Sequence, residues 1–241
     1  MNADLRPWGD LPGASLPLLR ATGDHDYPYW YLGTGFLVSF ANRLYILTAK
    51  HCLRTQDPNL LRIPARVNGP ELIPISRISR ADDSDPLEDY TDVVVLTVAP
   101  EYSHPSDPGV VEPFAIEGHW TSRFSAGQAL STRGFPYDGT RTLIDYEEKT
   151  IHLQAASFGA DYSEAGLGPF MHLIRFLDTV PITNFNSMSG SPVFVNPSRS
   201  IRQYTLAGML LRAGGRLGYF LDAGVLALTL DKVVKAWEPS R

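Results

Sequence analysis

The chain has 241 residues, a formal net charge of −5, and a hydrophobic content of 44%. These values suit one large folded domain or two small lobes with a substantial core, and they exclude an intrinsically disordered chain. The excess of acidic residues gives no reason to expect a nucleic acid or an anionic membrane as partner.

The single cysteine, Cys52, has no second cysteine with which to form an intramolecular disulfide. The fold therefore needs no oxidising compartment. Residues 1–20 lack the apolar core of a signal peptide, and no stretch approaches the roughly 20 apolar residues of a membrane-spanning helix. We therefore expect a cytoplasmic protein that does not cross a membrane.

Short apolar runs separated by turn residues cover most of the chain, which is typical of β-strands. In the first half, strands are expected at 29–40, 43–49, 71–79 and 92–98, with a tight hairpin between the first two. The segment 99–113 is rich in Pro, Ser and acidic residues and indicates a linker. In the second half, strands are expected at 127–136, 141–157, 171–180, 191–196, 203–213 and 218–228.

Only the C-terminal segment 229–237 has a helical pattern. Asp231 is its candidate cap, and Val233, Val234 and Trp237 fall at helical spacing. The pattern as a whole predicts an all-β fold in two lobes with a C-terminal helix.

His51 directly follows the apolar run 43–49. A lone histidine at a strand end is more often structural than catalytic, so its role depends on other segments. Asp92 begins the apolar strand 92–98. An exposed Asp there would be an ordinary strand-start residue, whereas a buried one could accept a hydrogen bond from a histidine Nδ1–H and stabilise the imidazolium.

The segment Asn-Ser-Met-Ser-Gly-Ser-Pro-Val-Phe-Val at 186–195 joins a run of small residues to an apolar strand. The simplest interpretation is a Ser/Gly-rich loop. Small residues also permit a sharp turn that aims several backbone N–H groups at one point. A serine hydroxyl at the apex of such a turn could attack a carbonyl, with the N–H groups receiving the oxyanion.

Five motifs follow one another along the chain: Gly-Thr-Gly-Phe-Leu-Val at 33–38, Leu-Thr-Ala-Lys-His-Cys at 47–52, Asp-Val-Val-Val-Leu at 92–96, Ser-Met-Ser-Gly-Ser-Pro-Val-Phe at 187–194 and Leu-Ala-Gly-Met-Leu-Leu at 206–211. In content and order they resemble the chymotrypsin-like serine peptidases, whose triad runs His, Asp, Ser along the chain. The resemblance extends from about Gly33 to Trp237.

The resemblance implies a single trypsin-like peptidase domain over 1–241, built from two six-stranded antiparallel β-barrels with the active site between them. The N-terminal barrel would cover about 14–98, the linker 99–113, the C-terminal barrel 114–228 and the helix 229–237.

The implied mechanism is acyl transfer without a metal or cofactor. Ser189 would attack a peptide carbonyl, His51 would move the proton to the leaving amine, and Asp92 would orient His51. The backbone N–H groups of Ser187 and Ser189 would form the oxyanion hole.

Four positions depart from the family pattern. Ser187 stands where the family usually has Gly, which puts the oxyanion hole in doubt until substrate binds. Met188 replaces an Asp that pairs with the new N-terminus in secreted members, and the activation cleavage motif is absent, so activation by zymogen cleavage is not expected. Ser191 replaces a second Gly, as in bacterial-type relatives. Leu211 replaces a Ser that often supports the catalytic Asp.

The resemblance places the base of the primary specificity pocket at Thr183. Because Thr is neutral, a strong preference for Arg or Lys is not expected. Leu and Ala side chains nearby would favour a hydrophobic or small residue, whereas polar side chains could bind a polar one, and a shallow or closed pocket is the alternative. The candidate substrate-binding residues are Thr183, Asn184, Asn186, Leu210, Leu211 and Ala213.

Cys52 is an alternative nucleophile. Adjacent side chains on an extended backbone point apart, so Cys52 is not expected to share a site with His51. The other histidines show no zinc-binding spacing. The acidic segment 82–89 is expected to be solvated, although it could bind a cation or repel acidic substrates.

Three hypotheses follow. The first is an active intracellular serine endopeptidase that cleaves proteins or peptides. The second is a catalytically inactive binding or regulatory module with the same fold. The third is a latent bacterial peptidase that a ligand or a protein partner switches on, with a protein encoded in the same operon as one candidate partner. The intact set of His51, Asp92 and Ser189 favours the first, whereas Ser187, Leu211 and the missing activation motif keep the others open.

Overall fold

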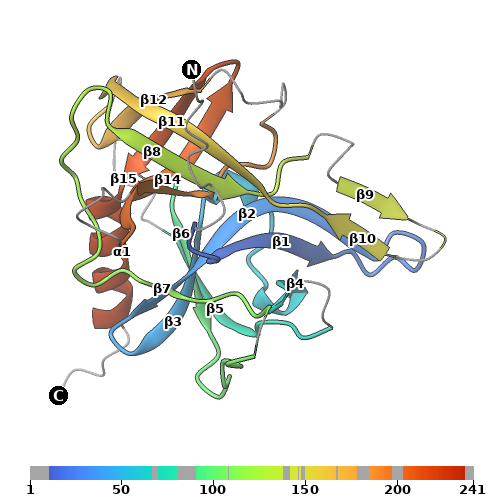
Figure 1. Cartoon of the computed structure of the whole chain (residues 1–241). Helices are drawn as coiled ribbons and strands as arrows, with labels where there is room; N and C mark the ends of the chain where they lie inside the picture. Colours follow the sequence, from blue (N-terminus) through green and yellow to red (C-terminus); the bar gives the residue numbers. More distant parts are fainter. Residues whose placement is uncertain are drawn as a thin grey trace.

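The computed structural model describes residues 11–66, 70–80, 91–107, 109–137, 142–145, 147, 150–166, 168–177, 185–196 and 203–236. Four prediction targets, Thr183, Asn184, Trp237 and the acidic segment 82–89, lie outside these residues. The described chain is mostly β-structure with one α-helix (Figure 1).

The first part of the chain forms a curled antiparallel sheet in the order β4-β1-β2-β3-β6-β5, with the short strand β7 parallel to β2. The prediction of a closed N-terminal barrel is wrong for the described strands, because β4 and β5 end this path without pairing with each other. The strands of this sheet are β1 Ser15–Ala21, β2 Tyr29–Phe40, β3 Arg43–Thr48, β4 Leu61–Arg62, β5 Ile75–Arg80, β6 Val94–Val98 and β7 Phe114–Ala115.

The predicted hairpin between β2 and β3 is confirmed. Ala41 and Asn42 connect the strands, with φ values of 49° and 58°. Positive φ at both central residues defines the two-residue type I′ turn that suits the twist of paired strands. This turn sets the register of β3 on β2 and therefore the position of the residues that follow β3.

The central strands of the sheet are buried on both faces. On β2, Leu37 belongs to the interior cluster of the curled sheet, whereas its neighbours Phe36 and Val38 belong to a second cluster. Successive side chains on a strand point to opposite faces, so this strand serves two cores. That is why its sequence is continuously apolar rather than alternating.

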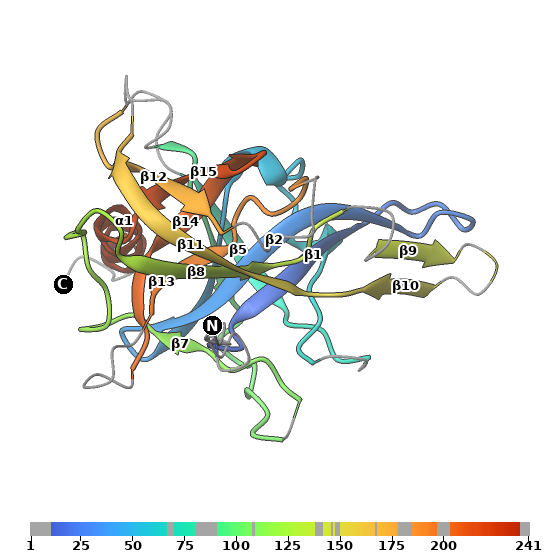
Figure 2. The ribbon, with the colours of Figure 1, turned by 45° about the horizontal axis from the view of Figure 1, so that its top comes forward.

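The second part of the chain forms a closed antiparallel barrel in the order β11-β12-β15-β14-β13-β8 (Figures 1 and 2). Phe158, Phe176 and Phe220 are among the buried aromatic residues that fill it. The predicted C-terminal barrel of six strands is thereby confirmed. Its strands are β8 Ala129–Gly134, β11 Ala156–Ala165, β12 Met171–Phe176, β13 Pro192–Val195, β14 Thr205–Gly214 and β15 Leu217–Asp222.

The expected strand 141–157 is instead three elements. The strands β9 Thr142–Asp145 and β10 Thr150–Leu153 pair only with each other among the described strands, and β11 begins at Ala156. The hairpin of β9 and β10 extends away from the rest of the molecule (Figures 1 and 2).

The helix α1 spans Ala223–Lys235, so it begins earlier than predicted, and the expected strand 218–228 ends at Asp222. Asp222 caps the helix by accepting a hydrogen bond from the Gly224 N–H at 2.6 Å. Asp231, the predicted cap, lies inside the helix and pairs with Lys235 at 2.6 Å. Within the described part of the chain, no helix has the length and apolar character needed to cross a membrane.

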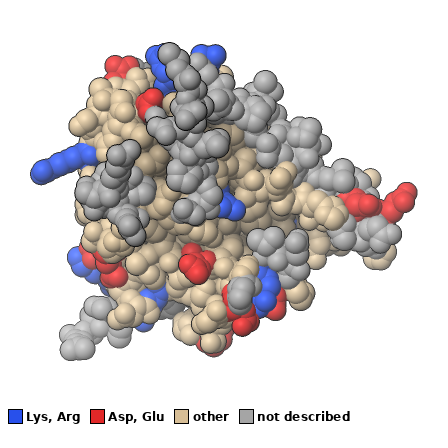
Figure 3. Space-filling view, in the orientation of Figure 1, with Lys and Arg blue, Asp and Glu red and all other residues tan. Residues whose placement is uncertain are grey.

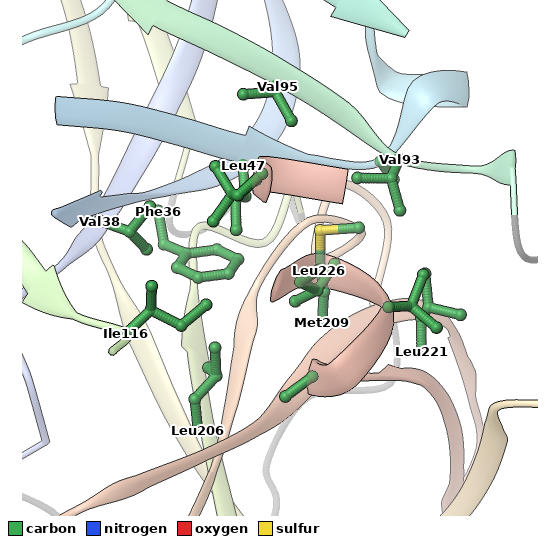
Figure 4. Close-up of a cluster of buried hydrophobic side chains, with 14 of the residues drawn as sticks. Phe36, Val38, Leu47, Val93, Val95, Ile116, Leu206, Met209, Leu221 and Leu226 are labelled. Carbon is green, nitrogen blue, oxygen red and sulfur yellow. The ribbon is translucent and has the colours of Figure 1, made fainter. Parts of the chain in front are cut away.

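One hydrophobic cluster joins the two halves of the molecule (Figure 4). The curled sheet supplies Phe36, Leu47 and Val95, while the barrel and α1 supply Met209 and Leu226. All five side chains are fully buried. Sheet and barrel are therefore packed against each other, and segments from both of them line the cleft described below.

Candidate active site

The register of β3 on β6 brings His51 next to Asp92. Thr48 pairs with Val94 in this antiparallel ladder, so the residues after β3 meet the residues before β6. The Lys50 N–H continues the pairing with a hydrogen bond of 3.4 Å to the Asp92 carbonyl. The chain then turns in one short 3₁₀ turn, Lys50–Cys52, which lifts His51 off the sheet.

The Asp92 carboxylate holds His51 at two points. Oδ2 lies 2.6 Å from the ring Nδ1, and Oδ1 accepts a hydrogen bond of 3.0 Å from the His51 backbone N–H. The Asp92 side chain is 16% exposed and the His51 side chain 49% exposed. The carboxylate therefore fixes the position of the ring, and an Nδ1–H donor leaves Nε2 directed elsewhere.

The same contact stabilises the charged form of the imidazole. The hydrogen bond to Asp92, with a smaller contribution from Cys52, raises the pKa of His51 from 6.5 to about 10. His51 is then mostly protonated at neutral pH. It must lose that proton before it can accept another from a nucleophile.

Cys52 lines the same cleft as His51, and most of its side chain is buried. The residues Lys50–Cys52 form a helical turn, so the expectation based on an extended backbone is wrong. The Cys52 side chain is buried, and its Sγ donates a weak hydrogen bond of 3.5 Å to the Ser189 carbonyl. A Cβ on Gly33 would lie only 3.1 Å from this sulfur. Cys52 therefore fills the space between β2 and the loop that carries Ser189.

Two successive tight turns carry Ser189. The Met188 N–H donates to the Phe185 carbonyl at 3.1 Å, and the Ser191 N–H donates to the Met188 carbonyl at 3.0 Å. The third residues of the two turns, Ser187 and Gly190, have φ values of 68° and 88°. A positive φ at the third residue is the mark of a type II turn. Ser189 is the second residue of the second turn, at its apex.

Strand β2 packs directly against these two turns. A Cβ at Gly190 would lie 2.0 Å from the Thr34 carbonyl oxygen, so only glycine fits. The Thr34 Oγ1–H donates to the Ser187 carbonyl at 2.9 Å, and the Thr34 N–H donates to the Ser189 carbonyl at 3.4 Å. The motif at 33–38, on strand β2, therefore holds the loop that carries Ser189 in place.

Hydrogen bonds to two carbonyl groups of the loop determine where the N–H groups of the following residues point. The Asn186 carbonyl accepts from the Tyr137 N–H at 2.9 Å, and the Met188 carbonyl accepts from Ser191. Each anchored carbonyl fixes its peptide plane and directs the N–H of the following residue to the opposite side. Those following residues are Ser187 and Ser189, whose N–H groups find no acceptor among the described residues. They are the pair that the resemblance assigned to an oxyanion hole.

The Ser189 hydroxyl donates a hydrogen bond of 2.7 Å to the Leu211 carbonyl. Leu211 is skipped in the pairing of β14 with β15, where the register shifts between Leu210 and Arg212. Such a bulge takes one residue out of the ladder and re-aims its groups. No hydrogen bond joins Ser189 to His51 within the described part of the chain, so the hydroxyl has to turn from one to the other.

His51 and Ser189 line the same cleft, which has a volume of about 400 Å³. Of the predicted substrate-binding residues, Asn186, Leu211 and Ala213 also line it. Leu210 departs from the prediction, because it is fully buried among the residues that fill the barrel. The described lining of the cleft consists of Trp30, Tyr31, Leu32, His51, Cys52, Arg54, Phe185, Asn186, Ser187, Ser189, Leu211, Arg212 and Ala213.

The sequence interpretation missed several of these residues. Trp30, Tyr31 and Leu32 immediately precede the Gly-Thr-Gly-Phe motif, and Arg212 lies between two predicted substrate-binding residues. Their position next to recognised motifs was the signal that could have identified them as part of the site. Arg54 had a similar signal, since it follows His51 closely on the same segment.

A metal centre finds no support in the described residues, which contain no group of three or more His, Cys, Asp or Glu side chains able to hold an ion. Comparison of the chain with protein-family models and with curated proteins found no match in either set. A function for this protein therefore has to be inferred from the site itself.

Proposed function

We propose that the protein is a serine endopeptidase of the chymotrypsin-like type, with His51, Asp92 and Ser189 as its catalytic residues. The observation that carries the proposal is the carboxylate of Asp92, 2.6 Å from the Nδ1 of a histidine whose ring borders the same cleft as Ser189. A histidine oriented by a carboxylate, beside a serine at the apex of a sharp turn, is the arrangement that activates a hydroxyl for acyl transfer.

The reaction begins when the Ser189 hydroxyl leaves the Leu211 carbonyl and gives its proton to the Nε2 of neutral His51. The serine oxygen bonds to the carbonyl carbon of the substrate, and the carbonyl π electrons move to its oxygen. The N–H groups of Ser187 and Ser189 stabilise this oxyanion. Loss of one such donor typically costs about 2.7–4 kcal/mol of transition-state stabilisation.

The tetrahedral intermediate then expels the amine. The carbon–nitrogen bond breaks, and protonated His51 gives its proton to the departing nitrogen. Water, deprotonated by His51, attacks the resulting ester and releases the acid, which regenerates the Ser189 hydroxyl. Asp92 keeps the ring oriented and stabilises its charge throughout.

A second candidate, a latent form of the same peptidase, has its own support. The Ser189 hydroxyl is bonded to Leu211 instead of His51, and the raised pKa keeps His51 protonated at neutral pH. Both features are those of a site that is not ready for nucleophilic attack. Binding of a substrate or a protein partner would have to reorient Ser189 before attack.

Labelling with a fluorophosphonate probe tests the proposal. The probe reacts with a serine only when a base and an oxyanion hole are assembled around it, and mass spectrometry of the digested protein locates the modified residue. We expect the label on Ser189 and its loss in Ser189→Ala and His51→Ala.

Ser191→Ala is the matched control. Ser191 lies in the same loop, but its side chain is buried and its hydroxyl has no hydrogen-bond partner in the described structure. Ser191→Ala should therefore label like the wild type. A label that persists in His51→Ala would contradict the triad. If label is absent at every pH and peptides nevertheless bind in the cleft, the active peptidase is rejected, and the protein is either a latent peptidase or a binding module.

A further inference from the structure

Among the described residues that line the cleft, the charged side chains share one sign. Arg54 and Arg212 both line it and both are exposed. No Asp or Glu belongs to its described lining. His51, when protonated, adds a third positive charge to the same space.

This positive cleft contrasts with the rest of the molecule. The chain as a whole has a net charge of −5. On the face drawn in Figure 3, cationic and anionic side chains are scattered in small groups among uncharged residues. The two arginines are therefore not part of a generally basic surface, and their potential is focused where a substrate would bind.

The chemistry of the proposed reaction distinguishes the positions of the two arginines. His51 protonates the departing amine, so the leaving segment of a peptide passes the 3₁₀ turn Lys50–Cys52. Arg54 lies two residues beyond that turn and lines the same cleft. The acyl segment is bonded to Ser189, whose hydroxyl touches the Leu211 carbonyl. That segment passes the bulge of β14 at Leu211, and Arg212 is the next residue of the strand.

We propose that the cleft selects acidic peptide segments, with Arg212 contacting a carboxylate on the acyl side of the cleaved bond and Arg54 one on the leaving side. This inference rests on the proposed function, because it concerns the same cleft. Guanidinium groups suit this role, since they bind carboxylates through paired hydrogen bonds and stay charged at every relevant pH. The expected preference concerns the substrate residues that flank the cleaved bond.

Binding to the Ser189→Ala variant tests the inference without any need for catalysis. Three fluorescent peptides of equal length would differ only in the flanking positions, which carry Glu, Gln or Lys. Fluorescence anisotropy should rank the affinities Glu, then Gln, then Lys, with the Glu peptide bound about tenfold more tightly than the Gln peptide at low salt. The difference should shrink in about 0.5 M NaCl, where the Debye length falls to a few ångströms.

Arginine variants in the Ser189→Ala background assign the preference. Arg54→Gln and Arg212→Gln should each weaken binding of the Glu peptide about threefold, as expected for a partly solvated ion pair, and leave the Gln peptide unchanged. Arg77→Gln is the matched control, because Arg77 is exposed on β5 and is not among the residues that line the cleft. It should bind all three peptides like the parent variant.

Equal affinity for the three peptides would overturn the inference. So would a preference for Lys. A preference for Glu that survives both arginine substitutions would also overturn it. Binding of the Glu peptide as expected, together with no labelling of Ser189 in the wild type, would support the charge selection and reject an active triad in the isolated protein.

Discussion

Ser187 adopts a backbone conformation that favours glycine, with φ at 68°. A residue with a Cβ pays roughly 1–2 kcal/mol for this region, and the cost is tolerated when surrounding contacts enforce it. Here the Thr34 hydroxyl holds the Ser187 carbonyl, and the bond from Met188 to Phe185 closes the turn around it. The strain therefore sits on one of the two N–H groups proposed to form the oxyanion hole.

Replacing Ser187 by glycine should relieve that strain. We expect Ser187→Gly to raise the free energy of unfolding by about 1 kcal/mol, and denaturant titration measures the change. Ser187→Ala keeps the Cβ and is the control, so it should show no gain. If Ser187→Gly unfolds at the same denaturant concentration as Ser187→Ala, the strain is not present in solution.

His51 sets the expected pH dependence of catalysis. Only its neutral form accepts the Ser189 proton, and the neutral fraction rises tenfold per pH unit below a pKa of about 10. The rate of fluorophosphonate labelling should therefore increase steadily from neutral pH and level off near pH 10. Rates are measured by quenching the reaction at intervals.

Asp92→Asn provides the comparison for this profile. Without the negative partner, the pKa of His51 should fall toward the ordinary histidine value of about 6.5, and the plateau rate should drop because the ring loses its orientation. A wild-type rate that is flat between pH 7 and 9 would mean that another group controls the reaction.

Single residues differ in how well sequence reveals them. The pairing of His51 with Asp92 was predictable from motif order, and β-sheet register then supplies the geometry. The bond from Ser189 to Leu211 was not predictable, because it depends on a bulge in the pairing of β14 with β15. Bulges arise from how two strands accommodate each other in three dimensions, and the local sequence around Leu211 reads as a regular strand.

At the scale of elements, the start of α1 depends on a buried carboxylate. Asp222 accepts hydrogen bonds from the Gly224 N–H and from the Ser122 hydroxyl at 2.5 Å, and its other oxygen lies 3.1 Å from His172 Nε2. The sequence after Tyr219 is apolar enough to continue a strand. Partners far away in the chain, Ser122 and His172, favour a cap at this point, and sequence periodicity contains no information about them.

Loss of this cap should destabilise the protein measurably. We expect Asp222→Ala to lower the free energy of unfolding by at least about 2 kcal/mol, since the helix loses its cap and buried donors lose their acceptor. Asp231→Ala removes only a surface pair with Lys235 and should cost less than about 0.5 kcal/mol. Thermal unfolding of both variants provides the measurement, and equal losses would contradict a special role for Asp222.

At the scale of the whole molecule, the cluster that joins sheet and barrel has energetic consequences. The motif order predicted two lobes with a cleft between them, and the described cleft takes residues from both. The sequence predicted a closed barrel in each lobe, and among the described strands only those of the second lobe close into a barrel. The pairing of distant strands that leaves the first sheet open depends on which edges remain available after packing, and strand patterns do not encode that.

The common core should make the two halves unfold together. Leu47→Ala, on the sheet side, and Leu226→Ala, on the helix, each empty a fully buried site and should cost about 3 kcal/mol. Scanning calorimetry should show one transition in the wild type, and each variant should shift that same transition to lower temperature. Two separate peaks, with each substitution moving a different one, would mean that the halves are energetically independent.

The hairpin of β9 and β10 lies outside this cooperative unit. Its two strands pair only with each other among the described strands, and a two-stranded ribbon is marginally stable by itself. Its amide hydrogens should therefore exchange with deuterated water by local opening, orders of magnitude faster than those of β13 and β14, which require opening of the barrel. The molecule would then have a slowly exchanging body and a rapidly exchanging arm, and a spectroscopic label attached to the arm would report on encounters at the surface without loosening the core.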